Sequence, residues 1–256
     1  LTLVLSISGA LSVKERVEFR ENNEEKYSLK EMLQFLRYKP IWAAFAATLI
    51  VGTGSSIAGG AGAYFYTYVL GDMKLMSGVS VIGLIASLVG IVMGPYLANR
   101  FGKKKVSLTA VIISTALNLL RLLDVTSMIL IYISALIGGV AGGWMVPVNT
   151  SIQADNTTYV QYKTGKRAEA AIASLTSFVS KVAQGLGGAI PGYVIAAYGF
   201  VTGASVQPES INTGIILCAL ILPLIFGILG LLIFGTQYTL DQKAVIEMDA
   251  KINRNN

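Results

Sequence analysis

Histidine is absent from this chain of 256 residues, and cysteine occurs once, as Cys218 within an apolar run. Without histidine the chain lacks the commonest general base and metal ligand, and a single cysteine permits no disulfide within the chain. No phosphate-binding loop, nucleophile–base set or paired-carboxylate site is visible. The sequence therefore predicts that the protein is not an enzyme, and we expect no cofactor and no metal site in this chain.

Charged residues are also scarce, at 13% of the chain, against about 25% in an average soluble domain. Hydrophobic residues make up 54%, and the mean hydropathy is +0.63. The net charge of +6 comes from positive residues that lie between apolar runs and not along one folded face. This distribution argues against a nucleic-acid partner and indicates a protein surrounded by membrane lipids.

Six long apolar segments follow one another along the chain. Each is near or above the roughly 20 residues that a helix needs to cross a bilayer. The runs are continuous and do not alternate, which favours helices over the strands of a barrel. The segments are 41–70, 77–98, 106–123, 128–148, 168–197 and 211–234. The predicted fold is an all-α membrane protein with six transmembrane helices.

The remaining segments divide the chain into four regions. Residues 1–11 are apolar but too short to span, and we interpret them as the end of a truncated transmembrane helix. We expect residues 12–40 to form a central linker, 41–235 a six-helix bundle and 236–256 a tail. Of the 20 Lys and Arg, 17 fall on one side of these helices, including the linker, the loops 99–105 and 151–167, and the tail. Because positive residues favour the inner side, linker and tail should be cytoplasmic in an inner-membrane protein.

The linker contains the pattern of a short amphipathic helix. Ser28 and Glu31 are spaced as in a capping box. Leu29, Met32, Leu33 and Leu36 then recur at helical spacing, and Pro40 should end the helix. We expect this helix to lie on the membrane surface, unless the segment is a plain solvated linker.

The fifth apolar segment carries a polar face. Ser177, Lys181 and Gln184 are spaced at i, i+4 and i+7 and therefore share one side of a helix. A lysine at membrane depth costs roughly 3 kcal/mol and usually faces a bundle interior or a water-filled cavity. The sequence favours a substrate or ion pathway at this face, with a snorkelling or ion-paired Lys181 as the alternative.

Glycine is concentrated in the first and fifth segments, and taken alone it favours tight helix packing over a helix broken at a cavity; in the fifth segment the neighbouring polar residues shift the balance towards a cavity. Trp144 lies near the end of the fourth segment, and Asn149 directly follows the segment. The Trp144 indole offers a face on which a sugar ring can stack, but an interface anchor or a packed side chain is an equally simple interpretation.

Two motifs resemble those of known families. The stretch Gly94–Lys105, with Asn99, Arg100, Lys103 and two further lysines, looks like the cytoplasmic loop signature of the major facilitator superfamily. In that signature the Arg and the loop backbone hold neighbouring helix ends together. The resemblance implies a loop clamp made by Asn99, Arg100 and Lys103.

The second stretch, 154–181, resembles the glycoside–pentoside–hexuronide:cation symporters, to which melibiose permeases belong. The matching residues are Ala154, Asp155, Tyr159, Tyr162, Lys163, Thr164, Gly165, Arg167 and Glu169, followed by Lys181 at the position of the family's helix lysine. The order of loops and helices is similar to the C-terminal half of such a transporter. Thr158 and Gln161 depart from the pattern, since the family usually has acidic residues at both positions.

The resemblance implies symport of a sugar or related glycoside with a cation, by alternating access of two six-helix halves. Lys181, Gln184, Ser177, Asn149 and Trp144 would contact substrate or the coupling site. A cytoplasmic gate would comprise Asp155, Tyr159, Lys163, Arg167 and Glu169. The coupling cation, sodium or a proton, would bind mainly in the N-terminal half that this chain lacks. A carrier of lipids or drugs, or a membrane sensor or assembly subunit that does not transport, are the alternatives.

Overall fold

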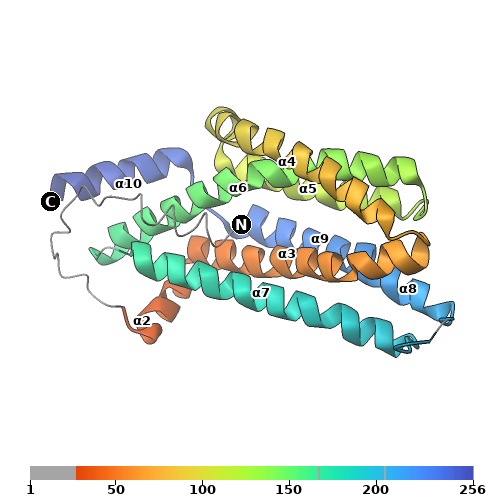
Figure 1. Cartoon of the computed structure of the whole chain (residues 1–256). Coiled ribbons are helices and arrows are strands. Elements are labelled where there is room, and N and C mark those ends of the chain that lie inside the picture. Colours follow the sequence, from red (N-terminus) through yellow and green to blue (C-terminus); the bar gives the residue numbers. More distant parts are fainter. Residues whose placement is uncertain (1–26, 167, 205, 256) are drawn as a thin grey trace, which may run out of the picture.

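The computed structural model describes residues 27–166, 168–204 and 206–255. The predicted truncated helix at 1–11 and most of the linker lie outside these residues. All regular elements of the described part are helical, and Figure 1 shows them as a long bundle. The elements are α2 (Leu29–Gln34), η1 (Phe35–Arg37), α3 (Lys39–Tyr64), η2 (Phe65–Val69), α4 (Lys74–Phe101), α5 (Lys103–Arg121), α6 (Met128–Thr164), α7 (Glu169–Ala197), α8 (Ser210–Ile216), η3 (Leu217–Ile221), α9 (Leu222–Gln237) and α10 (Gln242–Asn255).

The predicted amphipathic helix is α2, and its capping box is confirmed. The backbone N–H of Ser28 donates to Oε2 of Glu31 at 2.8 Å, and the N–H of Glu31 donates to Oγ of Ser28 at 3.3 Å. The apolar face of this segment differs from the expectation of a helix lying on the membrane surface. Phe35 is buried, and Met32 and Leu36 pack beside it against residues of α7. Part of the apolar face is therefore used for packing within the protein.

The membrane-protein prediction is confirmed at the level of helices and apolar length. Within the described part of the chain, four helical stretches are long and apolar enough to cross a membrane: Lys39–Val69, Lys74–Phe101, Met128–Thr164 and Ser210–Gln237. The other two predicted spans correspond to α5 and α7. Three lysines begin α5, and the polar residues around Lys181 lower the hydropathy of α7. Six spans therefore remain a prediction.

Two predicted loops are largely helical. The α6 helix does not end near Val148 but continues to Thr164, where Gly165 adopts a left-handed conformation (φ 71°). The Thr157 and Thr164 hydroxyls bond back to carbonyls one turn earlier, at 3.0 and 2.8 Å, so these polar residues are compatible with a helix. Gly102 alone separates α4 from α5. Most residues of the two expected loops thus belong to the flanking helices.

The long helices form two groups. Figure 1 shows α4, α5 and α6 together and α3, α7, α8 and α9 together. The α6 helix packs mainly on α4 and α5, whereas α7 packs mainly on α3. The α9 helix joins the groups because it packs on both α3 and α5. Helices α6 and α7 make few contacts with each other, because each packs mainly on other helices. The sides of α6 and α7 that face each other are therefore not in close contact.

The closest helix contact is the seam between α4 and α6. A Cβ on Gly143 of α6 would collide with the carbonyl oxygen of Ser87 and lie 2.8 Å from its carbonyl carbon. A Cβ on Gly90 of α4 would collide with the Val140 carbonyl oxygen in the same way. Only glycine lets the two backbones approach this closely. The seam fixes α4 and α6 to each other along much of their length.

Candidate functional site

The polar face of α7 is present as the spacing predicts. Ser177, Lys181 and Gln184 are all exposed, and the Lys181 ammonium group donates to Oε1 of Gln184 at 3.4 Å. The partner amide is neutral, and the ion pairs between described residues do not include Lys181. The face is therefore an open, positively charged surface of an otherwise apolar helix.

The neighbouring side of α7 lines a cavity of about 440 Å³ between the two helix groups. Five helices contribute to its wall: α3, α5, α6, α7 and α9. Amide and hydroxyl side chains dominate its polar surface, including Asn118, Asn149, Gln153, Asn156, Thr176 and Ser180. None of the described residues that line it is charged. A cavity of this size and polarity can hold a small molecule through hydrogen bonds.

The predicted substrate residues occupy three different places. Asn149 lines the cavity, whereas Lys181, Gln184 and Ser177 lie outside its lining on the exposed face of α7. Trp144 is 9% exposed and belongs to the packed core beside the α4–α6 seam. Its indole Nε1 is buried and has no hydrogen-bond partner among the described residues. The structure thus places the Trp144 side chain in packing and away from the cavity lining.

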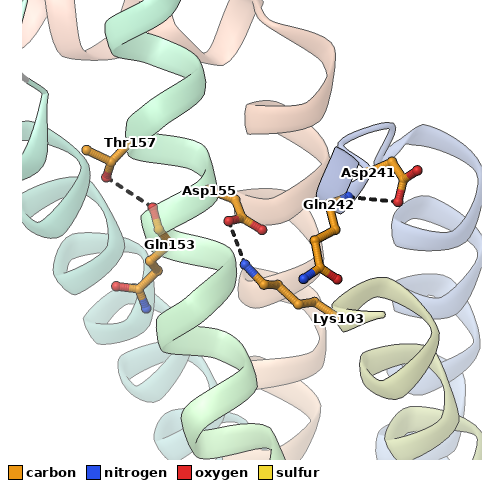
Figure 2. A network of polar contacts seen from close by, with 6 residues as sticks. All are labelled: Lys103, Gln153, Asp155, Thr157, Asp241 and Gln242. Carbon is orange, nitrogen blue, oxygen red and sulfur yellow. Dashed lines mark hydrogen bonds and ion pairs between the residues drawn. The ribbon is translucent and has the colours of Figure 1, made fainter. Parts of the chain in front are cut away.

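An ion pair joins the predicted loop clamp to the predicted gate. Lys103 Nζ lies 2.6 Å from Oδ1 of Asp155, and the two side chains are 20% and 10% exposed. Figure 2 shows Lys103 extending from the start of α5 towards Asp155 on α6. The pair ties two helices whose residues are 52 positions apart. Because it is largely withdrawn from solvent, its Coulomb attraction is weakly screened.

A second lysine contact, which the sequence did not predict, lies next to this pair. Lys104 Nζ donates to the carbonyl oxygen of Tyr238 at 2.6 Å and so ties α5 to the end of α9. The Tyr238 hydroxyl is buried without a partner among the described residues. Burial raises the pKa of the Tyr238 phenol well above its usual range, and the negative charge of Asp155 raises it further. Tyr238 therefore stays neutral beside the ion pair.

The other clamp residues contact their own helix end. Nη1 of Arg100 donates to the Tyr96 hydroxyl at 2.9 Å, and the guanidinium lies 5.4 Å from the centre of the Phe101 ring. Asn99 is exposed. The lysines of α5, and not Arg100, make the contacts between helices here.

The other gate residues are spread along the end of α6 and the start of α7. Lys163 Nζ lies 5.8 Å from the centre of the Tyr159 ring, and Tyr159 packs edge-on against Tyr38. Glu169 is exposed in the first turn of α7. Arg167 lies outside the described residues. The structure thus joins Asp155 to Lys103, while Tyr159 and Lys163 form a separate aromatic–cation contact.

Sequence reasoning missed the contribution of α5 to the cavity. Ser107, Ser114 and Asn118 all line it. Their spacing of seven and four residues places them on one face of a helix, so the signal was present in the sequence. The contribution of Asn156 was not detectable in this way, because its neighbours on α6 are polar on several sides.

Comparison with known proteins identifies the family. Residues 1–242 match the family model described as MFS/sugar transport protein. The chain is 30% identical over 242 residues to the Uncharacterized symporter YjmB of Bacillus subtilis, covering 92% of this chain and 52% of the relative. It is 28% identical over 263 residues to the Glucuronide carrier protein homolog of Escherichia coli, covering 97% and 56%.

A third relative, the Isoprimeverose transporter of Lactiplantibacillus pentosus, is 25% identical over 218 residues, covering 83% of this chain and 44% of the relative. The chain spans about half the length of the curated relatives that it matches. The four apolar helices of membrane-spanning length among the described residues agree with a multi-pass membrane protein. The match over nearly the whole chain shows that it belongs to the family of MFS/sugar transport proteins, which are transporters and not enzymes.

Proposed function

We propose that this chain is the C-terminal half of a symporter that carries a sugar or related glycoside with a cation across the inner membrane. The observation that carries the proposal is the exposed polar face of α7, where Lys181 stands on a helix that is otherwise apolar. The family and the names of the relatives support a sugar as cargo. Linker and tail would lie in the cytoplasm, as the distribution of Lys and Arg favours.

The exposed face of α7 is the surface that would meet the N-terminal half. An ammonium group withdrawn from water needs an anionic partner, and the neighbour of Lys181 within this chain is the neutral Gln184. A carboxylate of the other half would supply that partner. A coupling cation, sodium or a proton, would bind the same carboxylate and compete with Lys181 for it. Binding of the cation would then weaken the contact between Lys181 and the other half.

Substrate would bind near the middle of the membrane between the two halves, which rock against each other. Ser177 and Gln184 would offer hydrogen bonds to substrate hydroxyl groups, and Asn149 would do so from α6. Trp144 would support this site from the core, by holding α6 against α4. These roles are proposed from the exposed positions of Ser177 and Gln184 on α7 and from the position of Asn149 in the cavity wall.

The ion-pair end of the bundle would serve as the cytoplasmic gate and clamp. The Lys103–Asp155 pair holds α5 to α6. Tyr159, Lys163 and Glu169 flank the short α6–α7 connection, and together with Arg167 they would make and break contacts with the other half. Thr158 and Gln161 stand where the family usually has acidic residues, so this gate has two carboxylates fewer than the family pattern. The pair that Asp155 forms with Lys103 would then be its main electrostatic contact.

An uptake assay tests the proposal. The complete transporter, with the N-terminal half, is reconstituted in proteoliposomes and given labelled glycosides, pentoses and hexuronates. Runs use an inward sodium gradient, an inward proton gradient or neither. We expect one of the gradients to raise the initial uptake rate of a sugar at least tenfold. Folded protein without gradient-dependent uptake of any sugar would contradict symport and favour a lipid or drug carrier or a sensor.

A further inference from the structure

A line of exposed apolar side chains runs along α4 and ends at Arg100. Its members are spaced four residues apart and are each between 57% and 80% exposed: Leu84, Leu88, Val92 and Tyr96. Arg100 follows Tyr96 at the same spacing and is exposed too. Residues four positions apart are neighbours on the surface of a helix. These four apolar residues, called the α4 stripe below, therefore form a continuous surface that leads to a positive charge.

The α4 stripe faces away from the packed interior of the bundle. The buried residues of α4 are also spaced four apart, and the glycines among them lie directly against α6: Ala86, Gly90, Gly94 and Ala98. Each of them is two residues, or about 200° around the helix, from a member of the stripe. Figure 1 shows α4 at the edge of the bundle. The stripe therefore points outwards, to where lipid surrounds the protein.

Two of the four cations at this end of the bundle are not used inside the protein. The cations lie at the end of α4 and the start of α5: Arg100, Lys103, Lys104 and Lys105. Lys103 pairs with Asp155, and Lys104 donates to the carbonyl oxygen of Tyr238, so both bind other helices. Arg100 and Lys105 are exposed, and neither forms an ion pair with a described residue. They leave an uncompensated positive charge on the outer surface.

Two aromatic side chains hold the Arg100 guanidinium at the end of the stripe. Nη1 of Arg100 donates to the Tyr96 hydroxyl at 2.9 Å, and the guanidinium carbon lies 5.4 Å from the centre of the Phe101 ring. Both rings are more than half exposed, and tyrosine is enriched at membrane–water interfaces. A guanidinium has five N–H donors, so the bond to Tyr96 leaves several that can bind a phosphate.

The length of the stripe fits one leaflet of a bilayer. Residues 88–100 span about 18 Å along the helix axis, and half of the hydrocarbon core is about 15 Å thick. An acyl chain can therefore lie on Leu88 and Val92 while the phosphate of the same lipid reaches Arg100. In the proposed orientation this is the cytoplasmic leaflet, where anionic lipids are attracted to Lys and Arg beside a membrane helix.

We infer that the α4 stripe, Arg100 and Lys105 together bind an anionic phospholipid, with its phosphate at the two cations and an acyl chain along the stripe. A zwitterionic lipid binds less well, because its own cationic group cancels the charge of its phosphate. The inference goes beyond the proposed function and takes from it only the orientation in the membrane. It gives a ligand to Arg100, which does not join helices.

Titration with short-chain lipids tests the role of charge. The complete transporter, purified in a nonionic detergent, is titrated with dioctanoyl-phosphatidylglycerol or dioctanoyl-phosphatidylcholine, and binding is followed by microscale thermophoresis. Phosphatidylglycerol should bind at least tenfold more tightly. Arg100→Gln and Lys105→Gln should each weaken its binding about fivefold, the effect of one cation near an anionic surface. Arg100→Lys keeps the charge and should lose less than twofold.

Arg37→Gln is the matched control for these variants. Arg37 is an exposed cation at the same end of the bundle, but it precedes a segment of α3 that is largely buried. Its replacement removes the same charge without touching the α4 stripe. The affinity for phosphatidylglycerol should therefore change less than twofold.

Photolabelling tests where the acyl chain lies. The complete transporter is reconstituted in phosphatidylcholine with a small fraction of phosphatidylglycerol that carries a diazirine in its acyl chain, and labelled peptides are identified by mass spectrometry. Label should appear on residues 84–96, and the double variant Arg100→Gln, Lys105→Gln should lower it at least fivefold. The internal control is α9, which has exposed apolar residues but no Lys or Arg. Its labelling should not change.

Four results would overturn the inference. Equal affinity for the two lipids would remove the role of charge, and an equal loss in Arg37→Gln would show attraction by net charge alone. Binding of glycerol 3-phosphate as tight as that of phosphatidylglycerol would assign the cations to a soluble phosphate. Label on α9 but not on α4 would show that the other half of the transporter covers the stripe. Gel filtration and a thermal melt establish beforehand that each variant is folded.

The two assays also separate this inference from the proposed function, because neither of them requires transport. Lipid binding with these properties but without gradient-driven sugar uptake would contradict symport and leave the inference standing. Gradient-driven uptake by a transporter that does not distinguish the two lipids would do the reverse.

Discussion

The two sides of α6 differ sharply in how they meet their neighbours. Towards α4, glycines bring the backbones into contact, and no side chain separates Gly143 from Ser87. Towards α7, the same helix presents Asn149, Gln153 and Asn156 to a cavity whose wall is otherwise largely apolar. The glycines on one side of α6 fix the helix against α4. The amide side chains on its other side are not used in that packing and can form hydrogen bonds with a bound molecule. Within a lipid bilayer, helices associate through close packing and not through the hydrophobic effect, so the glycine contacts are what would hold α6 to α4 there.

The largest effect should come from filling the seam. Gly143→Ala places a methyl group against the Ser87 backbone, where neither partner can move aside. We expect a loss of about 3 kcal/mol, at the upper end of the range for overpacked sites. Thermal unfolding in detergent, followed by gel filtration, measures the loss.

Gly142→Ala is the matched control for this variant. Gly142 lies next to Gly143 on α6, but a Cβ there meets nothing within 4 Å. It should leave stability unchanged or raise it by up to about 1 kcal/mol, since alanine is the better helix former. Equal destabilisation by both substitutions would show that the seam is not as closely packed as the structure has it.

An intermediate effect should follow when the ion pair between α5 and α6 is broken. Asp155→Leu leaves the Lys103 ammonium without its anion, and we expect a loss of about 2 kcal/mol, reduced from the cost of a fully buried pair by the remaining exposure. Lys103→Met should cost a similar amount. The double variant should recover most of the loss, because it leaves no unpaired charge. Additive losses in a double-mutant cycle would contradict coupling between these two side chains.

The smallest effect on stability should come from Lys181. Its side chain is exposed, and its contact is a 3.4 Å hydrogen bond to a neutral amide on the same face. Lys181→Ala should therefore shift the free energy of unfolding of this chain by no more than about 0.5 kcal/mol. A larger loss of stability in the thermal melt would show that Lys181 has a structural role. It would then favour the alternative interpretation, in which Lys181 is a packed or snorkelling side chain.

Much of the fold could be predicted from patterns of residues that are close together in the sequence. Continuous apolar runs predicted helices of membrane length, and the Ser28–Glu31 spacing predicted the capping box that is present. The shared face of Ser177, Lys181 and Gln184 also follows from helical spacing. These features depend on residues a few positions apart, whose relative placement the helix itself determines.

Features that depend on distant partners were not predictable. Asp155 pairs with Lys103, 52 residues earlier, and nothing in the spacing of these two residues indicates the contact. The glycines of the first and fifth segments predicted tight packing, and Gly187 of α7 does lie directly against α3, but the close seam between α4 and α6 was not predicted. A glycine in the sequence indicates that another helix can pack closely there, but it does not indicate which helix does so. The stretch after Val148 seemed too polar for a helix, yet packing of Val245 and Met248 from α10 supports it.

The most direct test of the account is the initial rate of labelled sugar uptake by proteoliposomes of the complete transporter, wild type and Lys181→Ala side by side. The two proteins should have equal melting temperatures and equal amounts of folded protein in the membrane. The account predicts that a cation gradient drives uptake in the wild type and that Lys181→Ala loses at least nine-tenths of that rate. Uptake that is driven by the gradient and unchanged in Lys181→Ala would contradict a coupling role for this lysine.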